Sequence, residues 1–329
     1  MMTSRERMLA AMNHEKVDRV PTDITYVPEI CEKLVAQFGS ETEMLEVLHV
    51  DGHAWVDAKY IGPPMQNGTF WAPGMVDAKT VDDLRRYPWP TVDWFDYSEM
   101  RATAEQLHDK LVISCGNVGP FFFHNCQRGL EQSLIDPYDN PELTRYLLER
   151  MDGFLCEHLR RMFQACDGLI DISYLADDLG SQIGPLLNPT VFREFYKPSM
   201  KRTNDLCHEF GIKVLHHDDG AIRPLLPELV EIGIDILDPV QWRCPGMEIE
   251  GLKTDFGEQI CFHGGVDNQY TLPFGTPEDV RAEVRHLIDV LASDQTGYIL
   301  GPCHAMLANT PVENIIALYD EAWKYGKFV

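Results

Sequence analysis

Three short polar strings in the C-terminal half of the chain contain side chains suited to chemistry. They are HHDDG at 216–220, HGG at 263–265 and GPCH at 301–304. Histidine, aspartate and cysteine bind metal ions, and histidine also transfers protons near neutral pH. Each string follows a short apolar run that is typical of a buried strand. We therefore expect the reactive groups to lie at strand ends.

The elements that must position these groups repeat along the chain. Between the apolar runs lie stretches with helical periodicity, of which 143–163 is the clearest. This strand, loop and helix order predicts an α/β protein whose parallel sheet closes into a (β/α)8, TIM-type barrel, and active sites of such barrels gather at the C-terminal strand ends. The predicted strands are 19–25, 111–115, 169–174, 212–215, 234–237, 260–262 and 298–300, with a weaker candidate for an eighth at 50–56.

The first hundred residues predict an N-terminal helix followed by an aromatic, Pro- and Gly-rich stretch at 55–94. We interpret this part as a helical and loop cap over the barrel mouth. Its aromatic side chains, Trp55 and Trp71 above all, are candidates to bind an apolar or aromatic substrate. The alternative is core packing, which is the commoner role of large aromatic residues.

Composition excludes several classes of function. The chain has 329 residues, with 28 basic and 52 acidic side chains and a net charge of −24. Such a charge repels nucleic acids and anionic membranes. Nine cysteines without a C-x-x-C pair predict reduced thiols. With no linker-like segment and no apolar run long enough to cross a bilayer, we expect one domain over 1–329 and a cytoplasmic protein.

The chain resembles the uroporphyrinogen decarboxylase superfamily along nearly its whole length. The resemblance lies in ADDLGSQIGPLLNPTVFREFYKPSMKRTNDL and HHDDGAIRPLLPEL within 176–241, and in the opening TSRERMLAAMNHEKVDRVP. It continues in GGVDNQYTLPFGTPEDV and GPCHAMLANTPVENIIALYD. These motifs occur in the expected order, and the resemblance implies a single (β/α)8 barrel.

One branch of this superfamily, the decarboxylases, has an arginine-rich signature of the form R-Q-A-G-R-Y that holds tetrapyrrole carboxylates. The corresponding region here, after Arg19, Val20 and Pro21, is TDITYVPEICEKL and contains no arginine. A substrate with many carboxylates needs fixed guanidinium groups, which argues against a tetrapyrrole. A cofactor-free decarboxylase of a tetrapyrrole or other aromatic acid remains an alternative.

The other branch comprises corrinoid-dependent methyltransferases, which imply a zinc ion held by a His-x-Cys pair and a distant cysteine. The shared G-x-I-R-P string places the pair on His217 and Asp219, and the distant ligand on Cys303. Asp219 stands where zinc-binding members often have cysteine, and a carboxylate also binds Zn²⁺. The alternative is a hydrogen-bonded His217–Asp219 pair with Cys303 as a small apolar residue.

This resemblance implies a zinc-dependent methyltransferase that demethylates a small methoxylated, aromatic substrate. A methyl ether is a poor electrophile, and a metal on the leaving oxygen activates it. An oxygen-containing ligand set favours an ether over a thiol as the substrate. The chain lacks the D-x-H-x-x-G string of corrinoid carriers, so a partner protein must bring the corrinoid. A barrel that binds a corrinoid or porphyrin without catalysis is the non-enzymatic alternative.

Further polar residues complete the expected site. Asp178 is a candidate acid for the leaving group, with its pKa raised by a neighbouring carboxylate, and Asp177 is a candidate substrate contact. The alternative for this pair is an N-cap of the helix that follows. Strand alternation turns His216 toward the helix layer. His263 and His304 are acid–base or orienting candidates, and the polar groups expected to bind substrate are Asp23, Asn117 and Gln241.

Overall fold

The computed structural model describes residues 1–64 and 74–328, except for the side chain of Asn117. Two compact units, each built from separate segments of the chain, make up the protein. Unit 1 consists of Met1–Ala54, Asp109–Val112 and Asp235–Val329. Unit 2 consists of Trp55–His108 and Ile113–Ile234. A single domain over the whole chain stays a prediction.

The sheet of unit 1 contains three consecutive parallel strands, β7 (Ile236–Asp238), β8 (Cys261–Val266) and β9 (Tyr298–Pro302). Every residue of β8 is buried. This continuous burial is expected for a parallel strand that is covered on both faces.

The other edge of β9 pairs with the segment predicted as the first strand. Leu300 on β9 bonds to the backbone of residues 21 and 23 through N···O distances of 2.9 and 2.8 Å. The same segment accepts a bond of 3.0 Å from the backbone of Gly52, which directly precedes β1 (His53–Trp55). The weak strand candidate at 50–56 therefore contains a real strand.

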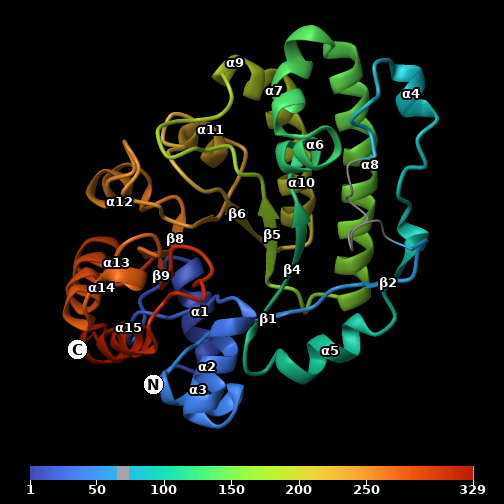
Figure 1. Ribbon diagram of the computed structural model, residues 1–329. Helices are drawn as coiled ribbons and strands as arrows, with labels where there is room; N and C mark the ends of the chain where they lie inside the picture. The colour runs from blue at the N-terminus through green and yellow to red at the C-terminus, as the bar shows by residue number, and fades with distance from the viewer. Residues whose placement is uncertain (65–73, 329) are drawn as a thin grey trace. The chain divides into compact units, whose positions relative to one another are not determined.

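Helices of unit 1 surround these strands. The pair α14 and α15 packs side by side (Figure 1). Helix α14 begins where Thr276 and Asp279 form a capping box, which satisfies backbone N–H groups at its first turn. The helices are α1 (Ser4–Met12), α2 (Pro28–Phe38), α3 (Glu41–Val47), α12 (Ile249–Phe256), α13 (Thr271–Phe274), α14 (Pro277–Leu291) and α15 (Val312–Tyr325).

Unit 2 has its own run of parallel strands, β4 (Val112–Val118), β5 (Ile172–Ala176) and β6 (Lys213–His217). The long helix α8 (Pro141–Cys166) runs alongside them (Figure 1). It begins where the Asn140 side chain accepts a bond from the backbone of the first turn, and it contains the predicted helix 143–163.

The remaining elements of unit 2 are short. Strand β2 lies within the aromatic stretch 55–94 and pairs with β3, which directly follows this stretch, in antiparallel fashion. The predicted substrate residue Trp71 lies outside the described residues. The elements are β2 (Lys59–Tyr60), α4 (Val81–Arg85), the 3-10 turn Val92–Trp94, β3 (Phe95–Asp96), α5 (Met100–Leu107), α6 (Pro120–Arg128), α7 (Leu130–Asp139), α9 (Pro189–Val191), the π-helical turn Phe192–Tyr196, α10 (Lys197–Glu209) and α11 (Leu226–Glu231).

The strands extend further toward the C-terminus than the apolar runs predicted. His217 is the last residue of β6, and His263 lies within β8, although we expected it to follow the strand. The physical reason is that backbone hydrogen bonding continues along a strand whatever the polarity of its side chains. The alternation of parallel strands and helices confirms the predicted α/β, TIM-type fold.

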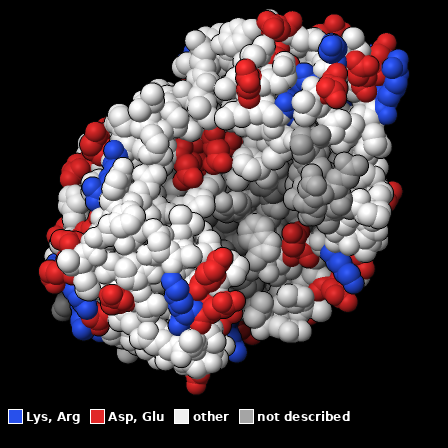
Figure 2. All heavy atoms as spheres, in the orientation of Figure 1, with Lys and Arg blue, Asp and Glu red and all other residues white. Residues whose placement is uncertain are grey.

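Acidic side chains outnumber basic ones over the face drawn in Figure 2, as the net charge of −24 requires. All nine cysteines are free thiols, which confirms that prediction. Among the described helices, none combines the length and the apolar character needed to cross a bilayer.

Candidate functional site

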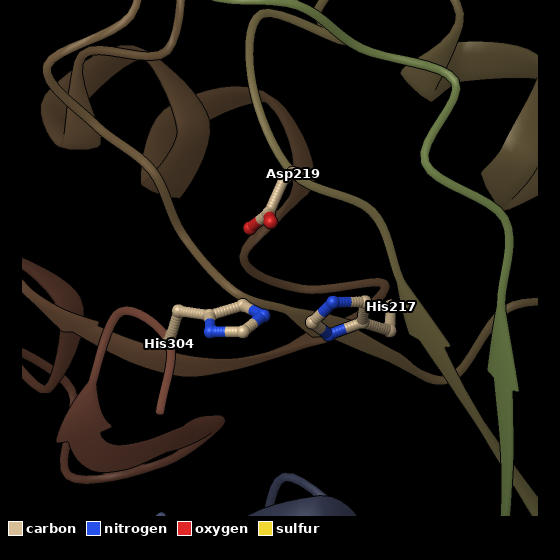
Figure 3. Close-up of side chains that lie close together, drawn as sticks. All are labelled: His217, Asp219 and His304. Atoms are coloured by element: carbon tan, nitrogen blue, oxygen red, sulfur yellow. The ribbon is translucent and has the colours of Figure 1, made fainter. Parts of the chain in front are cut away.

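The end of β6 carries the first group of candidate residues in unit 2. His217 and Asp219 are both half-buried, and their ligand atoms lie within 4.8 Å of one another. Figure 3 shows the imidazole of His217 at the strand end and the carboxylate of Asp219 on the loop that follows. An imidazole and a carboxylate offered at this separation are a donor pair of the kind that holds Zn²⁺.

Two glycines fix the loop that carries Asp219. A Cβ at Gly180 would lie 2.1 Å from the backbone oxygen of Asp219. Gly220 has a φ of +91°, and a Cβ there would meet backbone atoms of Ser181 at 2.5–2.9 Å. The loops after β5 and β6 therefore touch through their backbones, and only glycine permits this approach.

Asp178 lies beside the donor pair. Its Oδ1 atom is 3.9 Å from Nε2 of His217, and it is buried without a hydrogen-bond partner among the described residues. The backbone of Asp178 has a φ of +52°, a left-handed conformation that non-glycine residues rarely adopt. A buried acceptor without a partner on a strained residue is typical of a site that binds something else.

Asp177 has a different role from its neighbour. Its carboxylate is 1% exposed and accepts bonds from the backbone N–H groups of Phe121 and Phe122, at 2.7 and 3.1 Å, at the start of α6. Burial raises the pKa of Asp177 to about 7, and the Asp218 carboxylate adds to this. The Asp177 side chain therefore caps α6, and not the helix that follows Asp177 in the chain. This position gives no support to a substrate contact.

Two aromatic side chains, Tyr174 and Trp55, form a chain of ring contacts that begins at His217. The ring of Tyr174 lies 5.3 Å from that imidazole, and Trp55 meets Tyr174 edge-on at 5.9 Å. Trp55 is 46% exposed, so its ring is available to an aromatic ligand. His216 is 1% exposed, and its Nε2 atom lies 3.2 Å from Oδ2 of Asp218.

Unit 1 contains a network of four titratable side chains, and no sequence pattern indicated that they would meet. Nδ1 of His53 lies 2.8 Å from Oδ2 of Asp23. The same Asp23 oxygen is 3.1 Å from Nε2 of His263, whose Nδ1 lies 2.6 Å from Oδ1 of Asp238. We call these residues the Asp23 network.

Three members of the Asp23 network have pKa values far from their ordinary ones. Although burial favours neutral imidazole, Asp238 and Asp23 raise the pKa of His263 to about 10. Burial by itself would raise the pKa of Asp23. His53 and His263 outweigh this effect and hold the pKa of the carboxyl well below its usual range. The Asp23 carboxylate raises the pKa of His53 above its ordinary value. Such opposed shifts are found most often at functional sites.

Sequence reasoning missed two members of this network. Asp238 is the last residue of β7 and the first of the DPVQ string, and its place directly after the predicted apolar run 234–237 was an available signal. His53 lies in the weak strand candidate, and no local pattern marked it. Asp23 and His263 were predicted as site residues, but as separate ones.

The two candidate residues at the end of β9, Cys303 and His304, differ in exposure to solvent. Cys303 is 5% exposed, with Sγ 3.8 Å from the backbone oxygen of Val240. His304 is exposed and is drawn in Figure 3 on the segment after β9. Gln241 is 8% exposed. Asn117 lies opposite Leu175 in the pairing of β4 with β5.

Comparison with known proteins places the chain in a family. The family model described as uroporphyrinogen decarboxylase (URO-D) matches residues 77–325. A solved methyltransferase from Methanosarcina mazei is similar over 99% of this chain and 99% of its own, with 18% identity and a TM-score of 0.69. No curated protein matches the sequence significantly.

More distant structural similarities are weaker. A psychrophilic glycoside hydrolase family 10 endo-beta-1,4-xylanase has a TM-score of 0.47 and 10% identity, over 88% of this chain and 87% of its own. D-psicose 3-epimerase from Clostridium cellulolyticum H10 has a TM-score of 0.42 and 12% identity, over 74% and 85%. The family match covers most of the chain and confirms the resemblance seen in its motifs, so the protein belongs to the uroporphyrinogen decarboxylase family of (β/α)8 barrels.

Proposed function

We propose that the protein is a zinc-dependent methyltransferase that demethylates a small methoxylated, aromatic substrate and passes the methyl group to the corrinoid of a partner protein. The observation that carries this proposal is the group at the end of β6. There, His217 and Asp219 offer metal ligands beside a carboxylate oxygen of Asp178 that makes no hydrogen bond within the described part of the chain. This is the chemistry that an inert ether bond requires, because its oxygen must be stabilised as it leaves.

The N-terminal arginines support this proposal over tetrapyrrole decarboxylation. Arg7 is 2.6 Å from Asp51 and 2.7 Å from Asp18, and Arg19 is 2.8 Å from Asp51. Both guanidinium groups are buried, at 5% and 8% exposure. Arginines that already neutralise aspartates in the interior do not serve as forks for substrate carboxylates.

We propose His304 as the ligand from the end of β9, in place of Cys303. In a barrel of this family the C-terminal strand ends form one rim, which is where ligands from β6 and β9 would serve one ion. The His304 side chain is exposed, whereas the Cys303 thiol is buried. Imidazole nitrogens and a carboxylate oxygen are donors that zinc accepts.

When bound, zinc would supply a Lewis acid for the leaving oxygen and leave a position open for substrate. The protein's own residues bind and orient the substrate. The exposed ring of Trp55 provides an aromatic face in edge contact with Tyr174, and Tyr174 in turn packs against His217. Offset or edge-to-face contacts with a methoxylated ring would add about 0.5–1.5 kcal/mol to binding.

The full-length similarity to a solved methyltransferase is consistent with this proposal. The partner follows from the sequence, which lacks the D-x-H-x-x-G string of corrinoid carriers. A protein that demethylates an ether without its own corrinoid needs a second protein to take the methyl group.

Elemental mass spectrometry of the purified protein, followed by a methyl-transfer assay, tests the proposal. We expect about one zinc per chain, lost in His217→Ala and His304→Ala and retained in Cys303→Ser. Methoxylated phenols should then methylate cob(I)alamin in the presence of wild type, but not in the presence of His217→Ala.

Two results would contradict the proposal. Release of carbon dioxide from an aromatic acid without corrinoid would identify a decarboxylase. A tightly bound coloured tetrapyrrole without turnover would identify a binding protein. Loss of zinc in Cys303→Ser, with retention in His304→Ala, would restore Cys303 as the ligand.

A further inference from the structure

Helix α7 of unit 2 has its polar and apolar faces the opposite way round from an ordinary surface helix. A surface helix normally turns apolar side chains inward and polar ones toward solvent. Two of the three buried residues of α7 are polar, namely Ser133 and Asp136, at 0% and 1% exposure. Leu130, Ile135 and Tyr138 are 49%, 38% and 66% exposed. The inner face of α7 is therefore largely polar, and its outer face is largely apolar.

The inward polar groups of α7 find their partners on α6, against which α7 packs (Figure 1). The Asp136 carboxylate accepts a hydrogen bond of 2.7 Å from Nε of Arg128 and lies 3.2 Å from Nε2 of His124. The Ser133 hydroxyl donates to the side chain of Asn125. Breaking a buried ion pair is strongly destabilising, because it leaves an uncompensated charge. This pairing therefore determines which face of α7 turns outward.

The outward apolar side chains of α7 form one continuous stripe. Leu130, the half-buried Leu134 and Tyr138 follow one another at intervals of four residues. Residues at this spacing lie on the same side of a helix, and Ile135 adjoins them. We call these four residues the α7 stripe. Single exposed apolar residues are ordinary, whereas a contiguous apolar row on a helix is typical of a surface that another protein covers.

The charges beside the α7 stripe indicate what kind of protein would cover it. Glu131 and Asp139 on α7 are exposed, as is Glu142 in the first turn of α8, and α7 contains no basic residue. A second copy of this chain would bring the same acidic groups to the contact and would add its own net charge of −24. Like charges that meet across an interface oppose binding. The occupant that fits is therefore a different protein, whose apolar patch has a basic border.

The α7 stripe belongs to the connection that follows β4, at the same edge of the sheet as His217. Strands β4, β5 and β6 are parallel, so their C-terminal ends share one edge. Helix α6 begins directly after β4, and its first turn is capped by Asp177, which directly follows β5. His217 is the last residue of β6. A protein that brings a reactant to His217 must approach this edge, because active sites of such barrels open there.

We propose that the α7 stripe is the docking surface for the corrinoid protein that takes the methyl group, and that this protein meets the stripe with an apolar patch bordered by Lys or Arg. This inference rests on the proposed function, which requires such a partner. Tyr138 is the largest and most exposed member of the stripe. Tyrosine is enriched among the few residues that dominate the binding energy of an interface, so Tyr138 is the main anchor.

Methyl transfer to two different acceptors tests the docking surface. One acceptor is a corrinoid protein of the source organism that carries the D-x-H-x-x-G string, purified and reduced, and the other is free cob(I)alamin. With the corrinoid protein, kcat/KM should fall about 30-fold or more in Tyr138→Ala, and also fall in Ile135→Ser. With free cob(I)alamin, both variants should match wild type. Glu131→Lys should lower kcat/KM for the corrinoid protein and weaken its dependence on salt.

Analytical ultracentrifugation tests binding independently of any activity. Wild type and the purified corrinoid protein should form a complex, and Tyr138→Ala should weaken this complex to the same degree as it lowers kcat/KM. The matched control is Val47→Ser at the end of α3, an apolar side chain of 58% exposure outside the stripe, and it should leave binding and transfer unchanged. All these variants should keep the melting temperature of wild type, because the substituted side chains are on the surface.

The outcomes separate this inference from the proposed function. An equal loss with both acceptors, or no loss of binding in Tyr138→Ala and Ile135→Ser, would overturn the docking surface. Self-association of wild type that Tyr138→Ala abolishes would assign the α7 stripe to a second copy of the chain. If wild type transfers no methyl group to either acceptor, but binds the corrinoid protein through the stripe, the proposed function fails and the docking surface stands.

Discussion

Replacing Asp238 by asparagine removes one of the two carboxylates that hold the buried His263 imidazolium. Against an ordinary value near 6.5, the pKa of about 10 for His263 corresponds to about 5 kcal/mol of favourable interaction with the folded environment. Asp238 is one of the two carboxylates that raise this pKa, and a hydrogen bond to a charged group contributes about 1.5–3 kcal/mol. We therefore expect Asp238→Asn to lower the free energy of unfolding by about 2–3 kcal/mol at about pH 6.

The dependence on pH follows from the direction of the shift. A histidine whose pKa is raised on folding adds stability that is complete below its unfolded pKa, near 6.5, and is lost as pH rises through its folded pKa, about 10. The difference in unfolding free energy between wild type and Asp238→Asn should therefore shrink as pH rises from about 6.5 toward about 10.

Urea unfolding of both proteins at about pH 6, 8 and 10 measures this difference. The control is Asp109→Asn, an exposed aspartate in unit 1 that should change stability by less than about 0.5 kcal/mol at every pH. A difference below about 1 kcal/mol at pH 6, or one that is constant up to pH 10, would refute the reasoning.

Three further substitutions test other parts of the structure. In Gly180→Ala, the new Cβ would lie 2.1 Å from the backbone oxygen of Asp219, so we expect a lower melting temperature and less bound zinc. Gly153→Ala is the matched control, since it meets no atom within 4 Å in the middle of α8, and it should raise stability by about 0.5–1 kcal/mol. Tyr319→Phe removes the bond to the Asp23 carbonyl and should cost about 0.5–1.5 kcal/mol in unfolding free energy, with a shift in the nuclear magnetic resonance signal of His53. Trp55→Ala should raise KM for aromatic ethers more than it lowers kcat, and an unchanged KM would remove Trp55 from the substrate site.

The sequence by itself determined the order of the elements and the family. Apolar runs located β4 to β9 and the long helix α8, because burial of a strand or helix face imposes its period on the residue types. Strand alternation also turned His216 away from His217, and burial beside Asp218 agrees with that prediction. The candidate donors His217 and Asp219 came from a local string, which needs no tertiary contact to recognise.

Tertiary structure alone decided which charged groups meet. Asp23 and His263 are 240 residues apart in the chain, and no local pattern relates residues at that separation. The capping of α6 by Asp177 has the same cause, because the carboxylate and the helix start belong to different strand–helix repeats. Sequence periodicity reports which face of an element is buried, whereas the charge of a buried histidine depends on the atoms that surround it in space.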